Sequence, residues 1–361
     1  MSPGDPSTAV TRRGLAVMAW VVLISLLTSV LVEQRGLRWV QGVVWPSDLY
    51  TFQQVERGPI DIAVLGSSRA AFGVVPTSLD RCLAQELGRP TRTVNLARAF
   101  TTAYAADLLD EALLSGPRQP KMLVLVIEAE TFDEHNPHLS NNVATIAGLA
   151  DVPEALGTVH DLGTLFAVPQ PVARGPETLA LYLSGRWDTK PWLRWLMLHH
   201  GGGLFCTGSD PCRDHNKALE ASLKSWWTTV ATNLLPQLGP QRFPDYQAGD
   251  GPVYRHAERL LARAEEQGVQ VVLMELPRMP VFERGIPPQV EPAYRATLAR
   301  LLERHPLPHH PASTEVWAGQ RSFYLDAEHL TSSGAHRATK ELCKQTIAPL
   351  MRAADAADLG E

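Results

Sequence analysis

The stretch Ile62-Ala63-Val64-Leu65-Gly66-Ser67-Ser68-Arg69 decides the fold, because it joins a buried strand to a tight turn. Residues Ile60 to Leu65 are almost continuously apolar and rich in β-branched side chains, which favours a strand buried on both faces. Gly66 ends that pattern, so we expect Ser68 at the carboxyl end of the strand. An open α/β sheet binds its ligands in the crevice beyond the carboxyl ends of its strands.

A second motif, Asp326-Ala327-Glu328-His329, lies near the other end of the chain, before a helical pattern from about Ala335 to Ala353. Thr331 to Ser333 supply candidate N-cap residues for that helix. An Asp and a His three residues apart on a turn can hydrogen-bond directly. The Asp then fixes the imidazole tautomer, and the His accepts the proton of a serine hydroxyl. Ser68, His329 and Asp326 are therefore candidate catalytic residues.

Each motif also has a purely structural interpretation. Ser67 and Ser68 suit the N-cap of a helix that begins near Ala70 or after Pro76. Asp326 and His329 suit a surface turn that stabilises the last helix.

Strand and helix patterns alternate between the two motifs, which predicts an α/β fold with a parallel sheet. The predicted strands are Thr93–Leu96, Met122–Ile127 and Val269–Leu276, and the predicted helices are Thr102–Ser115 and Val253–Gln267. The alternation fails at about 137–252, where Pro and Gly separate short helical segments. We expect a helical insertion there, over the edge of the sheet that carries the site. The alternative is that these helices merely cover a sheet face.

The two motifs resemble the first and last blocks of the SGNH or GDSL-type hydrolases. Gly66-Ser67-Ser68 stands where that family has Gly-Asp-Ser, and Asp326 to His329 matches its Asp-x-x-His before the terminal helix. The likeness spans about residues 58 to 352. It is closer to the membrane-anchored Gly-Ser-Ser branch, which includes proteins that help O-acetylate alginate or D-alanylate teichoic acid. The resemblance implies an SGNH-like, flavodoxin-like three-layer sandwich, a Ser-His-Asp triad and no cofactor.

The middle blocks of that family match less well. The resemblance places the oxyanion donors at the backbone N–H groups of Ser68 and Ala97. Where the family has an Asn side chain, this chain has Glu128, and a carboxylate facing an oxyanion is repulsive unless it is protonated or turned away. Loss of one donor typically costs about 100- to 1000-fold in rate. Arg69, Glu128 and Arg278 are candidate substrate-binding residues, with a solvated loop position as the alternative for Arg278.

The first 57 residues are expected to lie outside the catalytic domain. Residues 14–32 carry no charge and are rich in Leu, Val and Ile, and a helix of that length spans about 28 Å, enough for a bilayer. Arg12 and Arg13 precede it, which favours a cytoplasmic N-terminus at residues 1–13. Residues 33–57 are then a stalk and 58–361 an exported domain. A cleaved signal peptide and the opposite topology are the alternatives.

The four cysteines give a further indication of compartment. Cys206 and Cys212 flank a short, turn-rich loop that suits a local disulfide, which persists only outside the cytoplasm. Zinc binding together with nearby histidines is the alternative, although five intervening residues exceed the usual zinc spacing. Cys82 and Cys343 fall within helical patterns and are interpreted as small buried hydrophobes. No metal site is predicted.

Composition excludes some functions. The net charge is −5, and no basic cluster alternates with aromatic residues, so nucleic acid is not an expected partner. The leading prediction is a serine ester hydrolase or O-acyltransferase, anchored in the inner membrane by one helix, with its domain in the periplasm or outside the cell. Its substrate is a cell-envelope glycan or lipid-linked acyl group, and the resemblance implies an integral-membrane acyltransferase as partner. The alternative function is a non-catalytic envelope scaffold that retains the fold.

Overall fold

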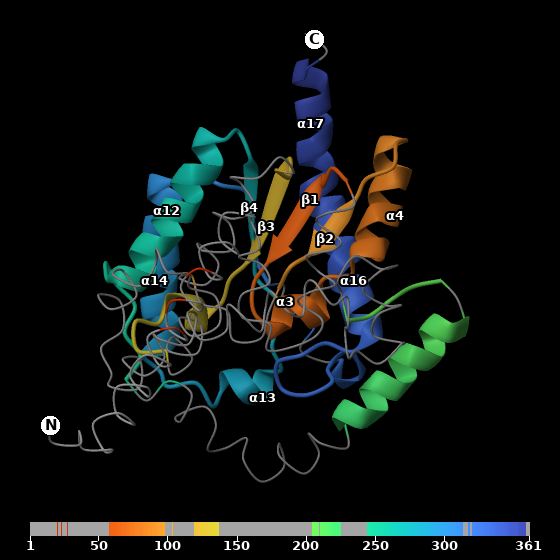
Figure 1. Cartoon of the computed structure of the whole chain (residues 1–361). Coiled ribbons are helices and arrows are strands. Elements are labelled where there is room, and N and C mark those ends of the chain that lie inside the picture. The colour runs from red at the N-terminus through yellow and green to blue at the C-terminus, as the bar shows by residue number, and fades with distance from the viewer. Residues whose placement is uncertain are drawn as a thin grey trace, which may run out of the picture.

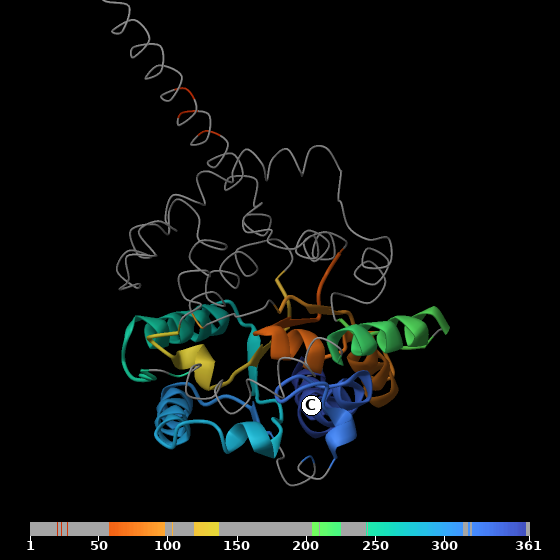
Figure 2. The ribbon, with the colours of Figure 1, turned by 90° about the horizontal axis from the view of Figure 1, so that it is seen from below.

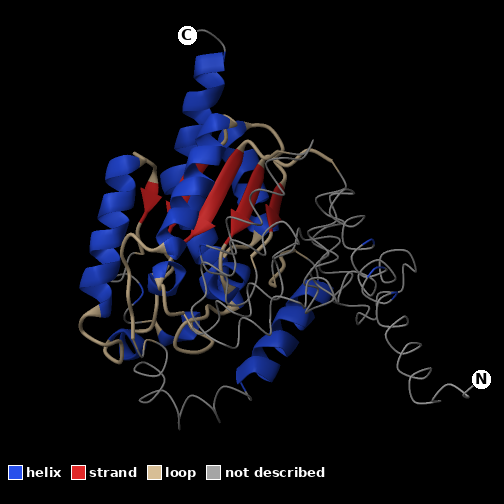
Figure 3. Cartoon of the chain, turned by 60° about the vertical axis from the view of Figure 1, so that its left-hand side comes forward, coloured by secondary structure: helices blue, strands red, loops and turns tan. Residues whose placement is uncertain are grey.

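The structure is a computed structural model that describes residues 58–97, 119–136, 204–208, 210–224, 243, 245–312, 317 and 320–358, with single residues at 20, 23, 27 and 103. Its centre is a five-stranded sheet in the order β2-β1-β3-β4-β5, in which all paired strands are parallel. The strands are β1 (Ile62–Leu65), β2 (Thr93–Asn95), β3 (Met122–Val126), β4 (Gln270–Met274) and β5 (His309–His310). The predicted α/β fold with a parallel sheet is confirmed, and Figure 3 shows the sheet among its helices.

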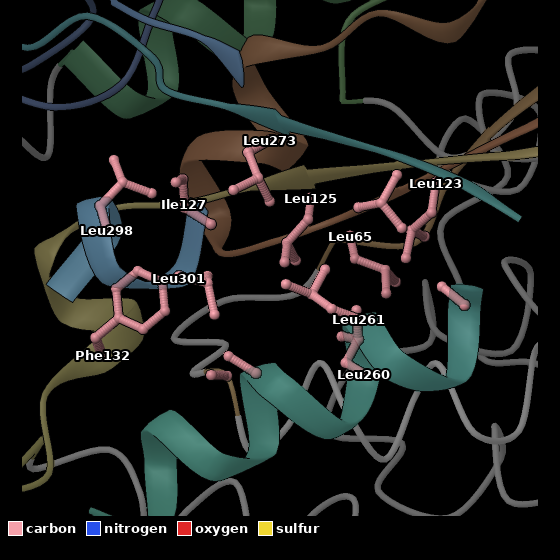
Figure 4. Packing of buried hydrophobic residues seen from close by; sticks show 14 of the residues in the cluster. Leu65, Leu123, Leu125, Ile127, Phe132, Leu260, Leu261, Leu273, Leu298 and Leu301 are labelled. Atoms are coloured by element: carbon pink, nitrogen blue, oxygen red, sulfur yellow. The ribbon is translucent and has the colours of Figure 1, made fainter. Parts of the chain in front are cut away.

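Helices cover both faces of the sheet, which explains why β1 and β3 are buried at every position. Successive strand residues point to opposite faces. Leu65, Leu123 and Leu125 therefore face one core, together with residues of α12 (Pro252–Glu266) and α14 (Val290–Arg304). Figure 4 shows this packing.

The second core lies on the opposite face, where Ile62, Val64 and Val124 meet helices from both ends of the chain. Figures 1 and 2 show the two helical layers. This layer comprises α3 (Ser68–Gly73), α4 (Pro76–Leu87), α16 (Ser332–Leu342), the π-helical turn η4 (Cys343–Ile347) and α17 (Ala348–Asp358). A helix was expected to begin after β1 either near Ala70 or after Pro76. The structure has a helix at each place, α3 from Ser68 and α4 from Pro76.

A disulfide joins Cys82 on α4 to Cys343 at the start of η4. The interpretation of these two residues as unpaired small hydrophobes is therefore wrong. Both side chains are buried, as expected, but α4 packs against η4 with the two Cα atoms 6.4 Å apart, within the range that a disulfide spans. Sequence patterns place each cysteine in a helix and contain no information about which helices touch.

The predicted elements differ from the observed ones mainly at their ends. The terminal helix begins at Ser332, three residues before the predicted start, because the side chain of Thr331 caps it by accepting a hydrogen bond from Gly334 N. The sequence patterns gave no assignment for α14, β5 or the short helices α13 (Pro280–Glu283) and η3 (Arg321–Phe323). Of the predicted helix at 102–115, only Ala103 is described, and it is helical and buried.

The N-terminal predictions and most of the insertion fall outside the described residues. These are the cytoplasmic segment 1–13, the anchor 14–32, the stalk 33–57 and much of 137–252. Within the anchor, Trp20, Leu23 and Leu27 are described; they are helical and exposed. In the described part of the chain, no helix has the length and hydropathy needed to cross a membrane.

Candidate active site

The turn after β1 depends on Gly66. Its φ of 149° is one that side-chain-bearing residues rarely adopt, and a Cβ at this position would lie 2.8 Å from Ala70 Cβ and 3.1 Å from the carbonyl oxygen of Val126. The glycine lets the chain turn sharply from the sheet into α3, which Figure 1 places beside the end of β1. Ser68, the first residue of α3, is thereby held at the carboxyl edge of the sheet.

The two serines of the motif have separate roles. Ser67 is the N-cap of α3, and its hydroxyl accepts a hydrogen bond from Arg69 N at 3.2 Å. The helix-capping interpretation thus holds for Ser67. The hydroxyl of Ser68 points elsewhere, to the imidazole of His329, with 2.9 Å between Ser68 Oγ and His329 Nε2.

Ser68, His329 and Asp326 form one hydrogen-bonded line across 261 residues of sequence. His329 Nδ1 lies 2.7 Å from Asp326 Oδ2, and the other carboxylate oxygen accepts from the backbone N–H groups of Glu328 and His329, both at 2.7 Å. A carboxylate partner places the ring proton on Nδ1, so Nε2 is the acceptor in the hydrogen bond with Ser68 Oγ. Asp326 is buried, so the surface-turn interpretation of this pair does not describe the structure.

The charge state of Asp326 suits that arrangement. Burial raises the pKa of its carboxyl group, but the hydrogen bonds from His329 and from two backbone N–H groups outweigh burial and bring the pKa below its ordinary value. The carboxylate is therefore ionised at neutral pH and able to hold the imidazole in one tautomer.

The turn that carries His329 is itself fixed by neighbouring elements. Leu325 N donates to His329 O at 2.9 Å, and Tyr324 forms an antiparallel bridge with Leu330. The ring of Phe72, one helical turn after Ser68 on α3, meets the imidazole edge-on with 5.0 Å between centroids. Ser68 and the ring of His329 are thus both held by the same short helix.

One described part of the insertion, residues 204–208 and 210–224, lies beside the site. Leu204 N donates to Ala71 O on α3, and the Phe205 ring packs edge-on against Phe72 at 5.8 Å. From the helix at 210–224, Asn216 and Glu220 bind Ser332, at the start of α16. These contacts place this part of the insertion next to both sequence motifs.

Cys206 and Cys212 are joined by the expected disulfide. Their sulfur atoms are bonded to each other and are therefore not zinc ligands. Among the described residues, no three His, Cys, Asp or Glu side chains lie in a group that could hold a metal ion.

The backbone N–H of Ala97, a candidate oxyanion donor, is already used in this structure. It donates to the side-chain oxygen of Asn95 at 3.0 Å, and the Asn95 amide nitrogen donates to Ala70 O and Val74 O. Asn95 thus ties the end of β2 to the middle of α3 and to its C-cap, Val74. The sequence patterns did not predict this contact, for which a polar amide ending a buried strand was the available signal. The N–H of Ser68 lies in the first turn of α3, where helical N–H groups have no acceptor within their own helix.

The three candidate substrate-binding residues form one buried cluster of charges. Glu128 follows β3, and its carboxylate turns to Arg69, at 2.8 Å, and to Arg278, at 3.6 Å. Arg278 also pairs with Glu130 at 2.6 Å. The expected repulsion between Glu128 and an oxyanion is therefore offset by two guanidinium groups, and all three residues contact protein partners.

Arg278 is not a solvated loop residue, because its side chain is 9% exposed. Burial lowers its pKa, but the carboxylates of Glu130, Glu128 and Glu328 outweigh burial and raise the pKa above its ordinary value. The guanidinium therefore stays charged inside the protein, as part of an ion-pair network behind the site.

Comparison with known proteins gives little further guidance. No protein-family model matches the chain. A segment is 30% identical, over 99 residues, to a cyclic di-GMP phosphodiesterase from Pseudomonas aeruginosa. The match covers 24% of this chain, and the chain spans 24% of that relative's length, so the likeness is confined to a part of each protein.

Proposed function

We propose that the chain is a serine ester hydrolase or O-acyltransferase of the SGNH type. The observation that carries the proposal is the hydrogen-bonded line Ser68–His329–Asp326 at the carboxyl edge of the sheet. The strand order supports it, since β2-β1-β3-β4-β5 is the order of flavodoxin-like doubly wound sheets. In such sheets the crevice lies where the chain changes direction between the first and third strands, and Ser68 follows the first.

In the proposed mechanism, Ser68 Oγ attacks an acyl carbonyl while His329 Nε2 accepts its proton. The protonated imidazole is stabilised by the Asp326 carboxylate and then gives its proton to the leaving alcohol. Water or a sugar hydroxyl, deprotonated by His329, releases the acyl group from Ser68 in the second half-reaction. The Ser68 N–H is the proposed oxyanion donor, because the Ala97 N–H is bound to Asn95.

The proposed setting is the cell envelope. Two disulfides support it, because such bonds persist in oxidising compartments and are rare in the cytosol. The uncharged segment 14–32 supports an inner-membrane anchor with the N-terminus inside. A domain tethered there is suited to a glycan or lipid-linked acyl substrate, and to an acyl group received from an integral-membrane acyltransferase.

A non-catalytic envelope scaffold is the second candidate. It is favoured by one observation, the engagement of Ala97 N–H by Asn95, which leaves one of the two expected oxyanion donors occupied. On this proposal the fold and the hydrogen-bonded line persist, but Ser68 does not receive an acyl group.

A serine-directed fluorophosphonate probe, applied to the purified full-length chain in mild detergent, separates the two. We expect labelling of the wild type and none of Ser68→Ala or His329→Ala, because the probe reacts only with an activated serine. Ser78→Ala, on α4 and outside the hydrogen-bonded line, should be labelled like the wild type. A folded wild-type protein that stays unlabelled would contradict the enzyme and support the scaffold.

A further inference from the structure

Arg69, the residue after Ser68, reaches three other segments with one side chain. Its Nη1 binds Glu128 at 2.8 Å, after β3, and its Nη2 donates to the carbonyl oxygens of Leu276 and Pro277, after β4. Its Nε donates to the carbonyl oxygen of Glu328, in the turn that carries His329, at 3.4 Å. The side chain is 3% exposed, so these contacts are made away from water.

The peptide group between Glu328 and His329 is held at both of its polar ends. Its carbonyl accepts from Arg69 Nε, and its N–H donates to Asp326 Oδ1 at 2.7 Å. A peptide group is planar and rigid, so fixing both ends fixes the direction in which the His329 side chain leaves the backbone. Asp326 holds the far side of the imidazole through Nδ1, but it belongs to the same turn and cannot set where that turn stands relative to Ser68.

Only arginine can make this set of contacts. Its guanidinium is a planar fork with five N–H donors in fixed directions, whereas lysine carries one ammonium on a flexible stem. A buried ion pair gives little net stability, because desolvating both charges offsets their attraction. The arrangement is therefore better explained by the geometry it imposes than by the stability it adds.

We propose that Arg69 is a positioning residue that sets the distance and angle between His329 and Ser68. The inference rests on the proposed function and deepens it. It replaces the expectation that Arg69 binds substrate, because each of its three guanidinium nitrogens is bonded to a protein acceptor.

The test compares Arg69→Lys with the wild type in two measurements on the full-length chain. The first is the rate of fluorophosphonate labelling as a function of probe concentration, which separates probe binding from the maximal rate. The maximal rate should fall about 100-fold, the effect of a displacement of about 1 Å between reacting groups, while probe binding stays the same. The second is the distance between Ser68 Oγ and His329 Nε2 in crystal structures of both proteins, which should be 2.9 Å in the wild type and about 1 Å longer in Arg69→Lys.

A second variant guards against misfolding. Arg69→Met combined with Glu128→Leu removes the buried pair together, so that no unpaired charge remains, and such replacements are often neutral for stability. It should unfold cooperatively and show the same loss of rate. Arg89→Met, which breaks an ion pair between the turn after α4 and Asp355 on α17, should label like the wild type.

The outcomes are distinguishable. Wild-type labelling rates in a folded Arg69 variant would overturn the inference while leaving the proposed function intact. An unlabelled wild type would overturn the proposed function, and the distance between Ser68 Oγ and His329 Nε2 would then decide on Arg69 alone. If that distance is the same in the wild type and in Arg69→Lys, Arg69 does not position His329.

Discussion

Asp326 uses both oxygens of its carboxylate within a single four-residue turn. One oxygen holds the imidazole of His329, and the other accepts two backbone N–H groups of the turn itself. The residue therefore shapes the turn and orients the imidazole of His329 at the same time. Three ordinary hydrogen bonds make the turn a rigid unit that needs to be placed only once against Ser68.

Replacement of Asp326 by Asn should lower the maximal rate of fluorophosphonate labelling by about 1,000- to 10,000-fold. The amide keeps an acceptor for the backbone but presents N–H to Nδ1, so the imidazole proton moves to Nε2, which then cannot accept from Ser68. Labelling of Asp326→Asn at the wild-type rate would show that the carboxylate does not set the tautomer.

Asp326→Asn should also change how the free energy of unfolding depends on pH in acid. The pKa of Asp326 is lowered on folding, so its contribution is complete above the ordinary value of 3.8 and is lost as the pH falls through the folded pKa. Asp326→Asn should therefore be less stable than the wild type at pH 7, and the difference should shrink in acid. Thermal unfolding between pH 3 and pH 7 measures both effects.

Residues of the site differ in how far the sequence reveals them. Ser68, Asp326 and His329 were predictable, because each belongs to a short motif whose local spacing expresses its chemistry. The contacts of Asn95 with α3, and of Arg69 with Glu328, were not. Both depend on the direction of a side chain across a packed interface, which local patterns do not encode.

At the scale of elements, a partly buried carboxylate joins α4 to the neighbourhood of β2. Asp80 on α4 accepts hydrogen bonds from the hydroxyls of Thr93, at 2.6 Å, and Thr91, at 3.3 Å. Burial raises the pKa of Asp80 to about 7, against the opposing effect of these hydrogen bonds and with a further increase from the nearby Asp61. This contact between helix and strand is therefore sensitive to pH.

Asp80→Asn should stabilise the protein at pH 8 and leave it nearly unchanged at pH 4. Because the folded pKa is raised, the folded state binds more protons than the unfolded state between pH 3.8 and about 7, so the wild type loses stability as the pH rises through that window. Asn keeps the acceptor for both threonines and cannot ionise. We expect a gain of about 1 to 3 kcal/mol at pH 8 in denaturant unfolding.

The control for this prediction is Asp355→Asn, which removes a half-exposed carboxylate on α17. It should lack the gain at high pH. A gain in Asp80→Asn that is equal at pH 4 and pH 8 would contradict the assignment of the effect to ionisation of Asp80.

Elements were predictable where their own residues decide them. The three central strands and α12 follow from continuous or periodic apolar runs, and their observed ends differ from prediction by one or two residues at most positions. The terminal helix was predicted without the π-helical turn at η4, which interrupts the helix where Cys343 meets α4. The π-helical turn lies where the helix contacts α4, and Cys82 on α4 is 261 residues away from Cys343 in sequence. Local sequence patterns therefore do not predict this distortion.

On the scale of the whole molecule, α4 and the terminal helix formed by α16, η4 and α17 run side by side in the same direction. Ser68 pairs with His329 and Cys82 with Cys343, each at a separation of 261 residues, and Arg89 pairs with Asp355 at 266. The disulfide and the Ser68–His329 hydrogen bond thus join residues 68–82 to residues 329–343 at two separate points.

Replacement of both Cys82 and Cys343 by Ala should lower the free energy of unfolding by about 2 to 5 kcal/mol, because the cross-link restricts a very long loop in the unfolded chain. Denaturant unfolding measures the loss, and mass spectrometry under non-reducing conditions maps the bond. The disulfide between Cys206 and Cys212 closes a separation of only 6 residues. Replacing both of these cysteines by Ala should therefore lower the free energy of unfolding by less. Free thiols at Cys82 and Cys343 in the native protein would contradict the pairing.

The parallel pairing of the two ends also sets an order of events during synthesis. A ribosome or a protein-conducting channel delivers the chain from its N-terminus, so Ser68 emerges long before His329 and the helix that follows it. Until the stretch from His329 to Cys343 has emerged, Ser68 lacks its contact with the imidazole, and Cys82 on α4 lacks the other half of its disulfide. On the proposed function, Ser68 therefore becomes a reactive nucleophile only after His329 has been delivered and has folded against it.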